Sequence, residues 1–212
     1  MSDELVFYTN PMSRGRIVRW MLEEVGQPYR TELLDYATTM KSPEYLAINP
    51  MGKVPAIRHG DVVVTEGAAI CAYLADAFPQ AGLAPAVNDR LRGTYYRWMF
   101  FAAGPAEAAV TNKSLGVVPS EDRRQMVGYG SLEAVMNALE LAVSDREYIV
   151  GDQFSAADVY VGSHIGWGLQ FGSFERRPAF ERYAARIMSR PAAVRAREID
   201  DALMPKAQPP AS

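Results

Sequence analysis

The protein has 212 residues, of which 49% are hydrophobic and 22% are charged, with a formal net charge of -3. These values are typical of a water-soluble globular chain, long enough for one large domain or two small ones. The charge gives no reason to expect nucleic acid or an anionic membrane as a partner, and no apolar run is long enough to span a bilayer. Residues 1–4 are acidic and lead directly into a strand pattern, so we expect no signal peptide and a cytoplasmic location.

The cysteine and histidine content predicts neither a disulfide nor a metal site. Cys71 is the only cysteine, and it lies in an apolar helical run where a small buried hydrophobic residue is expected. His59 and His164 stand alone in their regions, without other ligands at metal-binding spacing. We therefore expect no metal cofactor.

A strand, a loop and a helix are predicted at the start of the chain. Residues 5–8 form an apolar, β-prone run, and apolar residues then recur at helical spacing from Ile17 to Val25, with Gly26 as a stop. Ser13 lies where this helix begins. Unpaired N–H groups and the positive end of the helix dipole favour an anion there, although Ser13 alone is more often an N-cap than a catalytic group.

The next segments predict the rest of an α/β domain. A second strand at 29–34 completes a parallel βαβ unit, and Ser42-Pro43 opens a short helix. Residues 54–58 and 62–65 predict an antiparallel hairpin. A helix from 66 to 78 then completes the order βαβαββα. A cis Val54–Pro55 bond, which would turn the backbone of Val54 outward, is a hypothesis.

Beyond residue 87 the chain predicts only helices. The expected helices cover 89–111, bent at Gly104-Pro105, then 121–144, 155–168, 178–189 and 191–203. Ser155 and Asp158 predict a capping box at the start of the third of these. The tail from 205 is expected to be disordered. We predict an α/β domain at 1–80, a linker at 81–87 and an all-α domain at 88–212.

Four segments, in this order, resemble a cytosolic glutathione transferase of a bacterial, serine-type or theta-like kind. Residues 7–16 resemble the family's activating loop, 49–57 its "NPxGxVPxL" segment with a cis proline, 65–74 its "xESxAIxxYL" helix start, and 151–158 its "GDxFSxAD" folding cap. The resemblance covers nearly the whole chain. It implies a thioredoxin-like N-terminal domain followed by an all-helical domain, glutathione as co-substrate, and a homodimer.

The resemblance also implies which residues hold glutathione. The backbone of Val54, before Pro55, would pair with the cysteinyl amide as an added strand does. Lys53 and Lys41 are placed near the glycyl carboxylate. The carboxylate of Glu66 would meet the γ-glutamyl ammonium.

The γ-glutamyl carboxylate would meet the N–H groups at Gly67 and Ala68, where the next helix starts. Most family members carry Ser or Thr at the position of Gly67. The missing hydroxyl removes one hydrogen bond, worth roughly 1.5–3 kcal/mol if nothing replaces it, so weaker glutathione binding is an expectation.

Ser13 is the first choice for the group that activates the glutathione thiol, as a hydrogen-bond donor to the sulfur. No histidine accompanies it, which excludes a serine-hydrolase reading. Tyr8 is the second choice and Asn10 the third. Arg14 and Arg16 are expected on a solvated helix face. Ser13 also stands where thiol-exchange members carry cysteine, so a glutaredoxin-like activity is not expected.

The electrophile is expected above the sulfur in an apolar pocket that suits small hydrophobic molecules. About half of the candidate residues are expected to be core or dimer contacts, because aromatics at helical spacing are usually core. The predicted lining consists of Met12, Tyr95, Tyr96, Met99, Phe100, Ala103 and Trp167. Two other functions stay open: a non-catalytic glutathione-binding module, which Gly67 favours, and a glutathione-dependent lyase, isomerase or dehalogenase.

Overall fold

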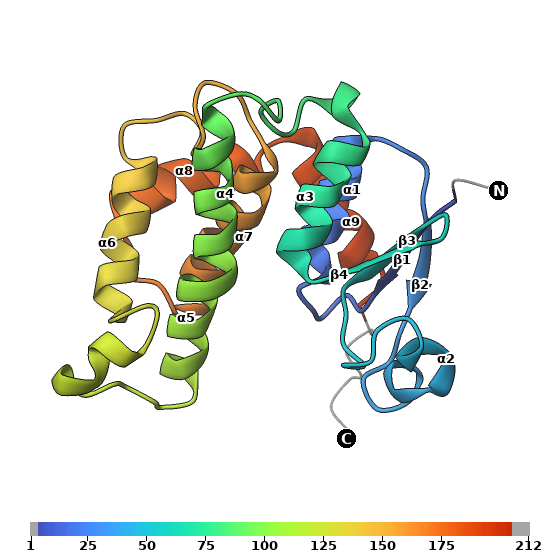
Figure 1. Ribbon diagram of the computed structural model, residues 1–212, viewed down its shortest axis with the longest axis horizontal. Coiled ribbons are helices and arrows are strands. Elements are labelled where there is room, and N and C mark those ends of the chain that lie inside the picture. The colour runs from blue at the N-terminus through green and yellow to red at the C-terminus, as the bar shows by residue number, and fades with distance from the viewer. Residues whose placement is uncertain (1–3, 205–212) are drawn as a thin grey trace, which may run out of the picture. The chain divides into compact units, whose positions relative to one another are not determined.

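The computed structural model describes residues 4–204, which group into two compact units. The first unit contains residues up to 70 together with those from 191 onward, and the second contains residues 71–190 (Figure 1). Helix α3 (Gly67–Ala77) begins in the first unit and ends in the second.

The first unit is built on a four-stranded mixed sheet. Its strands are β1 (Leu5–Thr9), β2 (Arg30–Leu33), β3 (Ala56–His59) and β4 (Val62–Thr65), in the order β2-β1-β3-β4. Strand β1 pairs in parallel with β2 and antiparallel with β3, which forms the predicted hairpin with β4. Helix α1 (Gly15–Val25) makes the parallel crossover and ends at Gly26, whose φ of 71° is left-handed. The predicted thioredoxin-like order is therefore confirmed.

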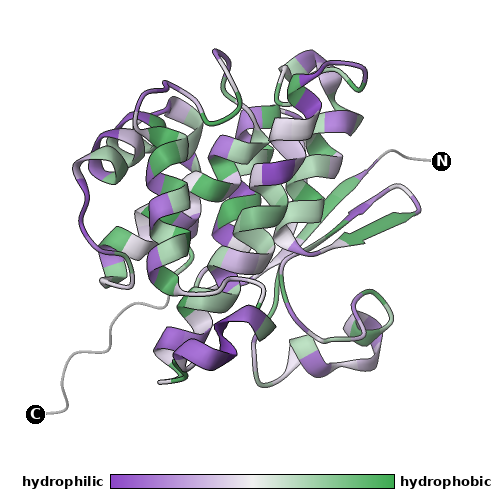
Figure 2. Ribbon diagram, turned by 60° about the vertical axis from the view of Figure 1, so that its left-hand side comes forward, coloured by the Kyte–Doolittle hydropathy of each residue, from purple (hydrophilic) through white to green (hydrophobic). Residues whose placement is uncertain are grey.

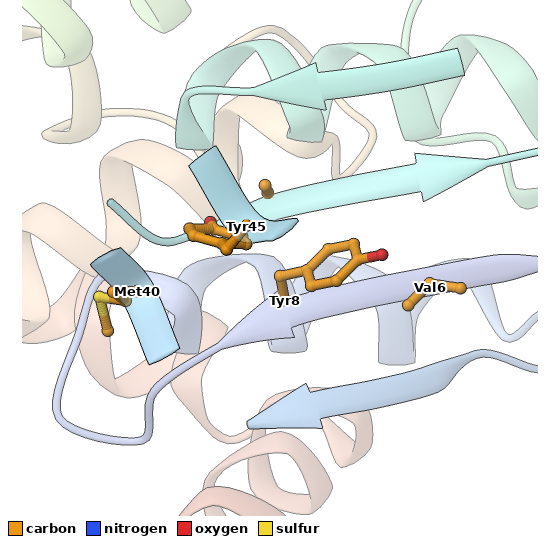
Figure 3. Packing of buried hydrophobic residues seen from close by; sticks show 5 residues of the cluster. Val6, Tyr8, Met40 and Tyr45 are labelled. Carbon is orange, nitrogen blue, oxygen red and sulfur yellow. The ribbon is translucent and has the colours of Figure 1, made fainter. Parts of the chain in front are cut away.

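Alternation along β1 sends its side chains to two buried faces. Val6 and Tyr8 pack with Met40, Tyr45 and Ala56 in one cluster (Figure 3). Met40 comes from the short 3-10 helix η1 (Thr39–Lys41) and Tyr45 from helix α2 (Pro43–Leu46), which the Ser42 side chain caps as predicted. This cluster fixes the segment before β3 against the end of β1.

The opposite face of β1 supports α1 and the last helix, α9 (Pro191–Ala202). Phe7 lies 6.3 Å from the ring of Tyr29, and the Arg19 guanidinium lies 5.0 Å above the Phe7 ring. Helices α1 and α9 lie side by side (Figure 1). Through its contacts, α9 belongs to the same unit as the sheet. The sequence predicts instead one helical domain over 88–212, and those domain limits stay a prediction.

The second unit begins with a long helical segment that changes type once. Helix α4 (Leu91–Phe101) continues into a π-helical turn, η3 (Ala102–Ala106), and then into α5 (Glu107–Ser114). Pro105 lies inside the π-helical turn. Because proline has no N–H to donate and its ring crowds the preceding turn, the regular α-helix is interrupted where Gly104-Pro105 predicted a bend.

The single helix predicted over 121–144 is wrong. Residues 121–126 form a 3-10 helix, η4 (Glu121–Met126), and α6 (Leu132–Val143) starts only after a non-helical stretch. Gly130 has a φ of 64°, which a continuing α-helix does not allow. Ser131 then caps α6, with its Oγ accepting from the Ala134 N–H at 3.1 Å.

The capping box predicted at Ser155 and Asp158 is present at the start of α7 (Ala156–Phe171). The buried Asp158 carboxylate accepts from the N–H groups of Ile149 and Ser155 at 2.8 and 2.9 Å. It also accepts from the Tyr183 hydroxyl of α8 (Pro178–Met188) at 2.7 Å. One carboxylate therefore ties α7 to α8 and to the loop before α7.

Hydrophobic and hydrophilic residues both occur along the helices (Figure 2). Helices α1, α6 and α8 bury one side, whereas α7 is buried along most of its length. Within residues 4–204, no helix is long and apolar enough to cross a membrane. The tail predicted to be disordered lies outside the described residues.

Candidate functional site

The loop between β1 and α1 forms a tight turn around one carbonyl. The Asn10 carbonyl accepts from the Ser13 N–H at 3.1 Å and from the Ser13 hydroxyl at 2.6 Å. The same hydroxyl oxygen accepts from the Gly15 N–H at 2.9 Å. Ser13 therefore lies half-buried at the start of α1, where the positive end of the helix dipole favours an anion. In this conformation its hydroxyl proton is held by Asn10.

The other two candidate donors are placed differently from Ser13. The Asn10 amide is engaged at both ends: Nδ2 donates to the Leu34 carbonyl at 2.8 Å, and Oδ1 accepts from the Met12 N–H at 2.9 Å. Tyr8 is 8% exposed, and its ring lies 5.7 Å from that of Tyr45 in the buried cluster. Of the three, Ser13 alone has a side chain fixed only to its own loop.

Arg16 differs from its expected place on a solvated helix face. Its side chain is 24% exposed. Its Nε donates to the Pro11 carbonyl at 2.6 Å, and its Nη1 lies 2.7 Å from Oδ1 of Asp201 on α9. No local pattern predicts this contact, because the partners are 185 residues apart.

The segment before β3 has the backbone geometry that the sequence suggested as a hypothesis. The Val54–Pro55 peptide bond is cis. The preceding carbonyl, of Lys53, accepts from the Tyr45 hydroxyl at 2.6 Å and from Asn49 Nδ2 at 2.8 Å. Between residues 4 and 204, the N–H and carbonyl of Val54 have no hydrogen-bond partner. Val54 therefore offers an unpaired, strand-like backbone.

The two candidate lysines have different surroundings. Lys41 Nζ donates to the Gly52 carbonyl at 2.8 Å, so it helps to hold the loop. The close approach requires glycine: Gly52 has a φ of 57°, and a Cβ there would lie 2.8 Å from the Met40 carbonyl oxygen. Lys53 is exposed, and no carboxylate among the described residues pairs with it.

Glu66 occupies the junction between β4 and α3. Its φ of 67° makes it the only residue other than glycine with positive φ in the described part of the chain. Its carbonyl accepts from the Ile70 N–H at 2.9 Å, so the N–H groups of Gly67 and Ala68 lie in the first turn of the helix. The exposed Glu66 carboxylate has no hydrogen-bond partner among residues 4–204.

The residues predicted to line an electrophile pocket divide into buried and exposed groups. Tyr95 and Met99 are buried, and burial raises the pKa of the Tyr95 hydroxyl. Tyr96 and Phe100 are exposed, with ring centroids 6.4 Å apart on α4. Met12 of the first unit is also exposed, while Ala103 and Trp167 are half-buried.

A cavity of about 260 Å³ lies elsewhere in the second unit. Its lining comes from the end of α5, the following loop and the start of α6, and includes Ala109, Lys113, Arg124, Tyr129 and Leu132. None of the residues predicted for the electrophile lines it.

In the part of the chain that the structure describes, no three His, Cys, Asp or Glu side chains form a metal-binding group. Cys71 is buried, which raises the pKa of its thiol.

Sequence comparison gives matches in both halves of the chain. The model of the glutathione S-transferase N-terminal domain matches residues 12–77, and that of the C-terminal domain matches residues 97–191. The glutathione S-transferase GstA of Escherichia coli is 30% identical over 165 residues, which cover 76% of this chain and 77% of the relative. Glutathione S-transferase GST-4.5 of Xanthomonas campestris is 28% identical over 179 residues, 78% of this chain and 83% of the relative.

Solved structures of similar chains share the fold. The glutathione transferase URE2P6 of Phanerochaete chrysosporium, solved with oxidized glutathione, has a TM-score of 0.79 at 26% identity, covering 96% of this chain and 99% of its own. A sphingomonad glutathione S-transferase complexed with glutathione has a TM-score of 0.76 at 27% identity, covering 92% and 98%. Together with the sheet order, the cis proline and the folding cap, these matches show that the chain belongs to the glutathione S-transferase family.

Proposed function

We propose that the protein binds glutathione in its first unit and activates the thiol for attack on small hydrophobic electrophiles. The observation that carries this proposal is the backbone of Val54. Its N–H and carbonyl have no hydrogen-bond partner between residues 4 and 204, and the Lys53 carbonyl beside it is held by two donors. An extended peptide pairs with such a backbone as an added strand. Glutathione is a tripeptide with one free amide N–H and carbonyl at its cysteinyl residue.

The charged ends of glutathione match groups that are unpaired in the structure. The Glu66 carboxylate is available to the γ-glutamyl ammonium, and the first-turn N–H groups at Gly67 and Ala68 are available to its carboxylate. Lys53 is available to the glycyl carboxylate. Lys41, which holds the Gly52 carbonyl, contributes by fixing the loop and adding positive potential.

Ser13 serves in this proposal as the donor to the glutathione sulfur. The attacking species is the thiolate, and a free thiol has a pKa of about 8.5. Lowering that pKa by two units requires about 2.7 kcal/mol, within reach of one charge-assisted hydrogen bond and the α1 dipole. The Ser13 hydroxyl must then leave the Asn10 carbonyl. That carbonyl keeps its bond from the Ser13 N–H, so it is not left unpaired.

The two hydrogen bonds that fix the Asn10 amide and the packing of Tyr8 in the buried cluster favour Ser13 over both. For the electrophile we propose a small apolar molecule, as the family resemblance implies. The family resemblance further supports a cytoplasmic homodimer without a metal cofactor. Light scattering of the purified protein measures the oligomeric state directly.

A non-catalytic glutathione-binding module is the second candidate, favoured by Gly67 in place of a hydroxyl residue. A glutathione-dependent lyase or dehalogenase remains the third. Retention on immobilised glutathione without turnover of any electrophile supports the module. A panel of electrophiles assayed with and without glutathione separates transfer from elimination.

The test of the transferase proposal is the substitution Ser13→Ala. Loss of a hydrogen bond to a charged sulfur is worth about 1.5–3 kcal/mol, so we expect the pKa of bound glutathione to rise by about 1–2 units. Turnover of a chlorinated dinitrobenzene at neutral pH falls about 10- to 100-fold, while retention on immobilised glutathione changes little. Thiolate absorbance of the complex, titrated against pH, measures the shift.

Ser131→Ala is the matched control, because Ser131 caps α6 in the second unit with one hydrogen bond. We expect it to leave the pKa of bound glutathione unchanged. If Ser13→Ala and Ser131→Ala give the same thiolate titration curve as the unmodified protein, Ser13 is not the donor.

A further inference from the structure

The side chain of Arg16 joins two segments from opposite ends of the chain. Its Nε donates to the Pro11 carbonyl in the loop that carries Ser13, at 2.6 Å. Its Nη1 pairs with Asp201 near the end of α9, at 2.7 Å. Both bonds are charge-assisted, and the planar guanidinium holds its donors in a fixed arrangement. Arg16 thus connects the activating loop to the last helix.

The Pro11–Met12 peptide unit is held at both of its polar ends. Arg16 holds the carbonyl, and Asn10 Oδ1 accepts from the Met12 N–H at 2.9 Å. Asn10 in turn donates to the Leu34 carbonyl, directly after β2. The Pro11–Met12 peptide, which ends one residue before Ser13, is therefore fixed between the sheet on one side and the α1–α9 pair on the other.

We propose that Arg16 is a positioning residue for Ser13, acting through the Pro11 carbonyl and braced by Asp201. This inference rests on the proposed role of Ser13. The 24% exposed Arg16 side chain donates to the Pro11 backbone, whereas an arginine that only joins α1 to α9 has no need of that bond. Small errors in placing a hydrogen-bond donor reduce its effect on a reacting atom sharply.

Arg195 provides the comparison within the same helix pair. Its Nε lies 3.2 Å from Glu23 Oε2, so it also joins α9 to α1. It touches neither the loop nor Ser13. Arg195→Gln therefore removes an α1–α9 ion pair and leaves the Pro11 carbonyl in place.

The experiment compares Arg16→Gln, Arg16→Lys and Arg195→Gln in complex with glutathione. We expect Arg16→Gln to raise the pKa of the bound thiol and to lower kcat at neutral pH about 3- to 10-fold, with a smaller change in KM for glutathione. Arg16→Lys keeps the charge but lacks the fork that reaches both partners, so we expect it to restore less than half of the loss. Arg195→Gln leaves the thiol pKa unchanged.

Three results overturn the inference. The first is an unchanged thiol pKa in Arg16→Gln, and the second is an equal shift of the thiol pKa in Arg195→Gln. The third is a wild-type thiol pKa and kcat in Arg16→Lys, which indicates that the positive charge alone acts. If Arg16→Gln does not fold, Asp201→Ala is measured in its place, since Asp201 is 58% exposed. We expect Asp201→Ala to lower kcat about two-fold. An unchanged kcat in this variant contradicts the proposed role of Asp201 in holding Arg16. If Ser13→Ala does not shift the thiol pKa, the proposed role of Ser13 fails, and the role of Arg16 fails with it. If Ser13→Ala shifts the thiol pKa and Arg16→Gln does not, only the role of Arg16 fails.

Discussion

Two tyrosine hydroxyls of the first unit donate short hydrogen bonds from partly buried positions. Tyr45 donates to the Lys53 carbonyl and Tyr29 donates to Glu23 Oε1, each at 2.6 Å. Burial raises the pKa of each to about 12, and for Tyr29 the bond to Glu23 adds to this. The folded protein thus holds these protons more tightly than the unfolded chain. The resulting stability is complete below pH 10, where unfolded tyrosines begin to ionise, and is lost as the pH rises toward about 12.

Replacing Tyr45 by Phe tests this at the level of one residue. The Lys53 carbonyl keeps its bond from Asn49, so we expect the free energy of unfolding at neutral pH to fall by about 0.5–1.5 kcal/mol. The decline in stability as the pH rises above about 10 becomes shallower, because one of the tyrosines with a raised pKa is gone. Urea unfolding curves at a series of pH values measure both. Tyr36→Phe, at a 49% exposed position, is the control. If the stability of Tyr45→Phe falls with rising pH as steeply as that of the unmodified protein, the Tyr45 hydroxyl does not contribute to the decline.

At the scale of an element, the start of α1 depends on one close approach. A Cβ on Gly15 would lie 1.9 Å from Thr9 Oγ1 and 2.9 Å from Ser13 Oγ. The last residue of β1 and the activating loop therefore come together only because Gly15 has no side chain. In α4, by contrast, a Cβ on Gly93 meets nothing within 4 Å.

These two glycines give opposite predictions for the same substitution. Gly15→Ala forces Thr9 and the loop to move, and we expect it to lower the free energy of unfolding by about 1–3 kcal/mol. Gly93→Ala adds a good helix former to an open position, and we expect a gain of about 0.5–1 kcal/mol. Urea unfolding of both variants measures the difference. A stability loss in Gly93→Ala equal to that in Gly15→Ala contradicts the steric argument.

For the molecule as a whole, the decisive feature is the return of the C-terminal helix to the first unit. Arg19 and Asp200 form an ion pair at 3.1 Å with both side chains at most 2% exposed. Arg19 also donates to the Tyr29 hydroxyl and to Thr31 Oγ1. Burying this pair is costly, so its two members depend on each other more than surface partners do.

Removing one partner should therefore cost far more than breaking an exposed pair. We expect Asp200→Ala to lower the free energy of unfolding by about 3–5 kcal/mol, because the Arg19 charge stays buried without a counter-ion. Arg195→Gln, which breaks the pair with Glu23 at a 53% exposed side chain, should cost about 0.2–1 kcal/mol. Thermal and urea unfolding measure both variants. If the two variants lose the same free energy of unfolding, the buried pair stabilises the fold no more than the exposed one.

The sequence by itself determined the features whose partners are near one another in the chain. Gly26 ends α1, Ser42 caps α2, and Ser155 with Asp158 caps α7, because each cap acts over at most a few residues. The same local signals predict the order of strands and helices along the first unit, and the family motif at 49–57 supports the cis proline. Apolar periodicity misled only at 121–144, where Gly130 and the cap at Ser131 outweigh it.

Tertiary structure alone decided which groups the candidate site residues hold. The Ser13 hydroxyl points to Asn10, Asn10 is fixed to Leu34, and Arg16 reaches Asp201 across 185 residues of sequence. No local pattern in the sequence predicts that α9 packs in the same unit as the sheet. Such contacts depend on how faces pack once the elements have formed, and a short stretch of sequence specifies the face but not the partner that covers it.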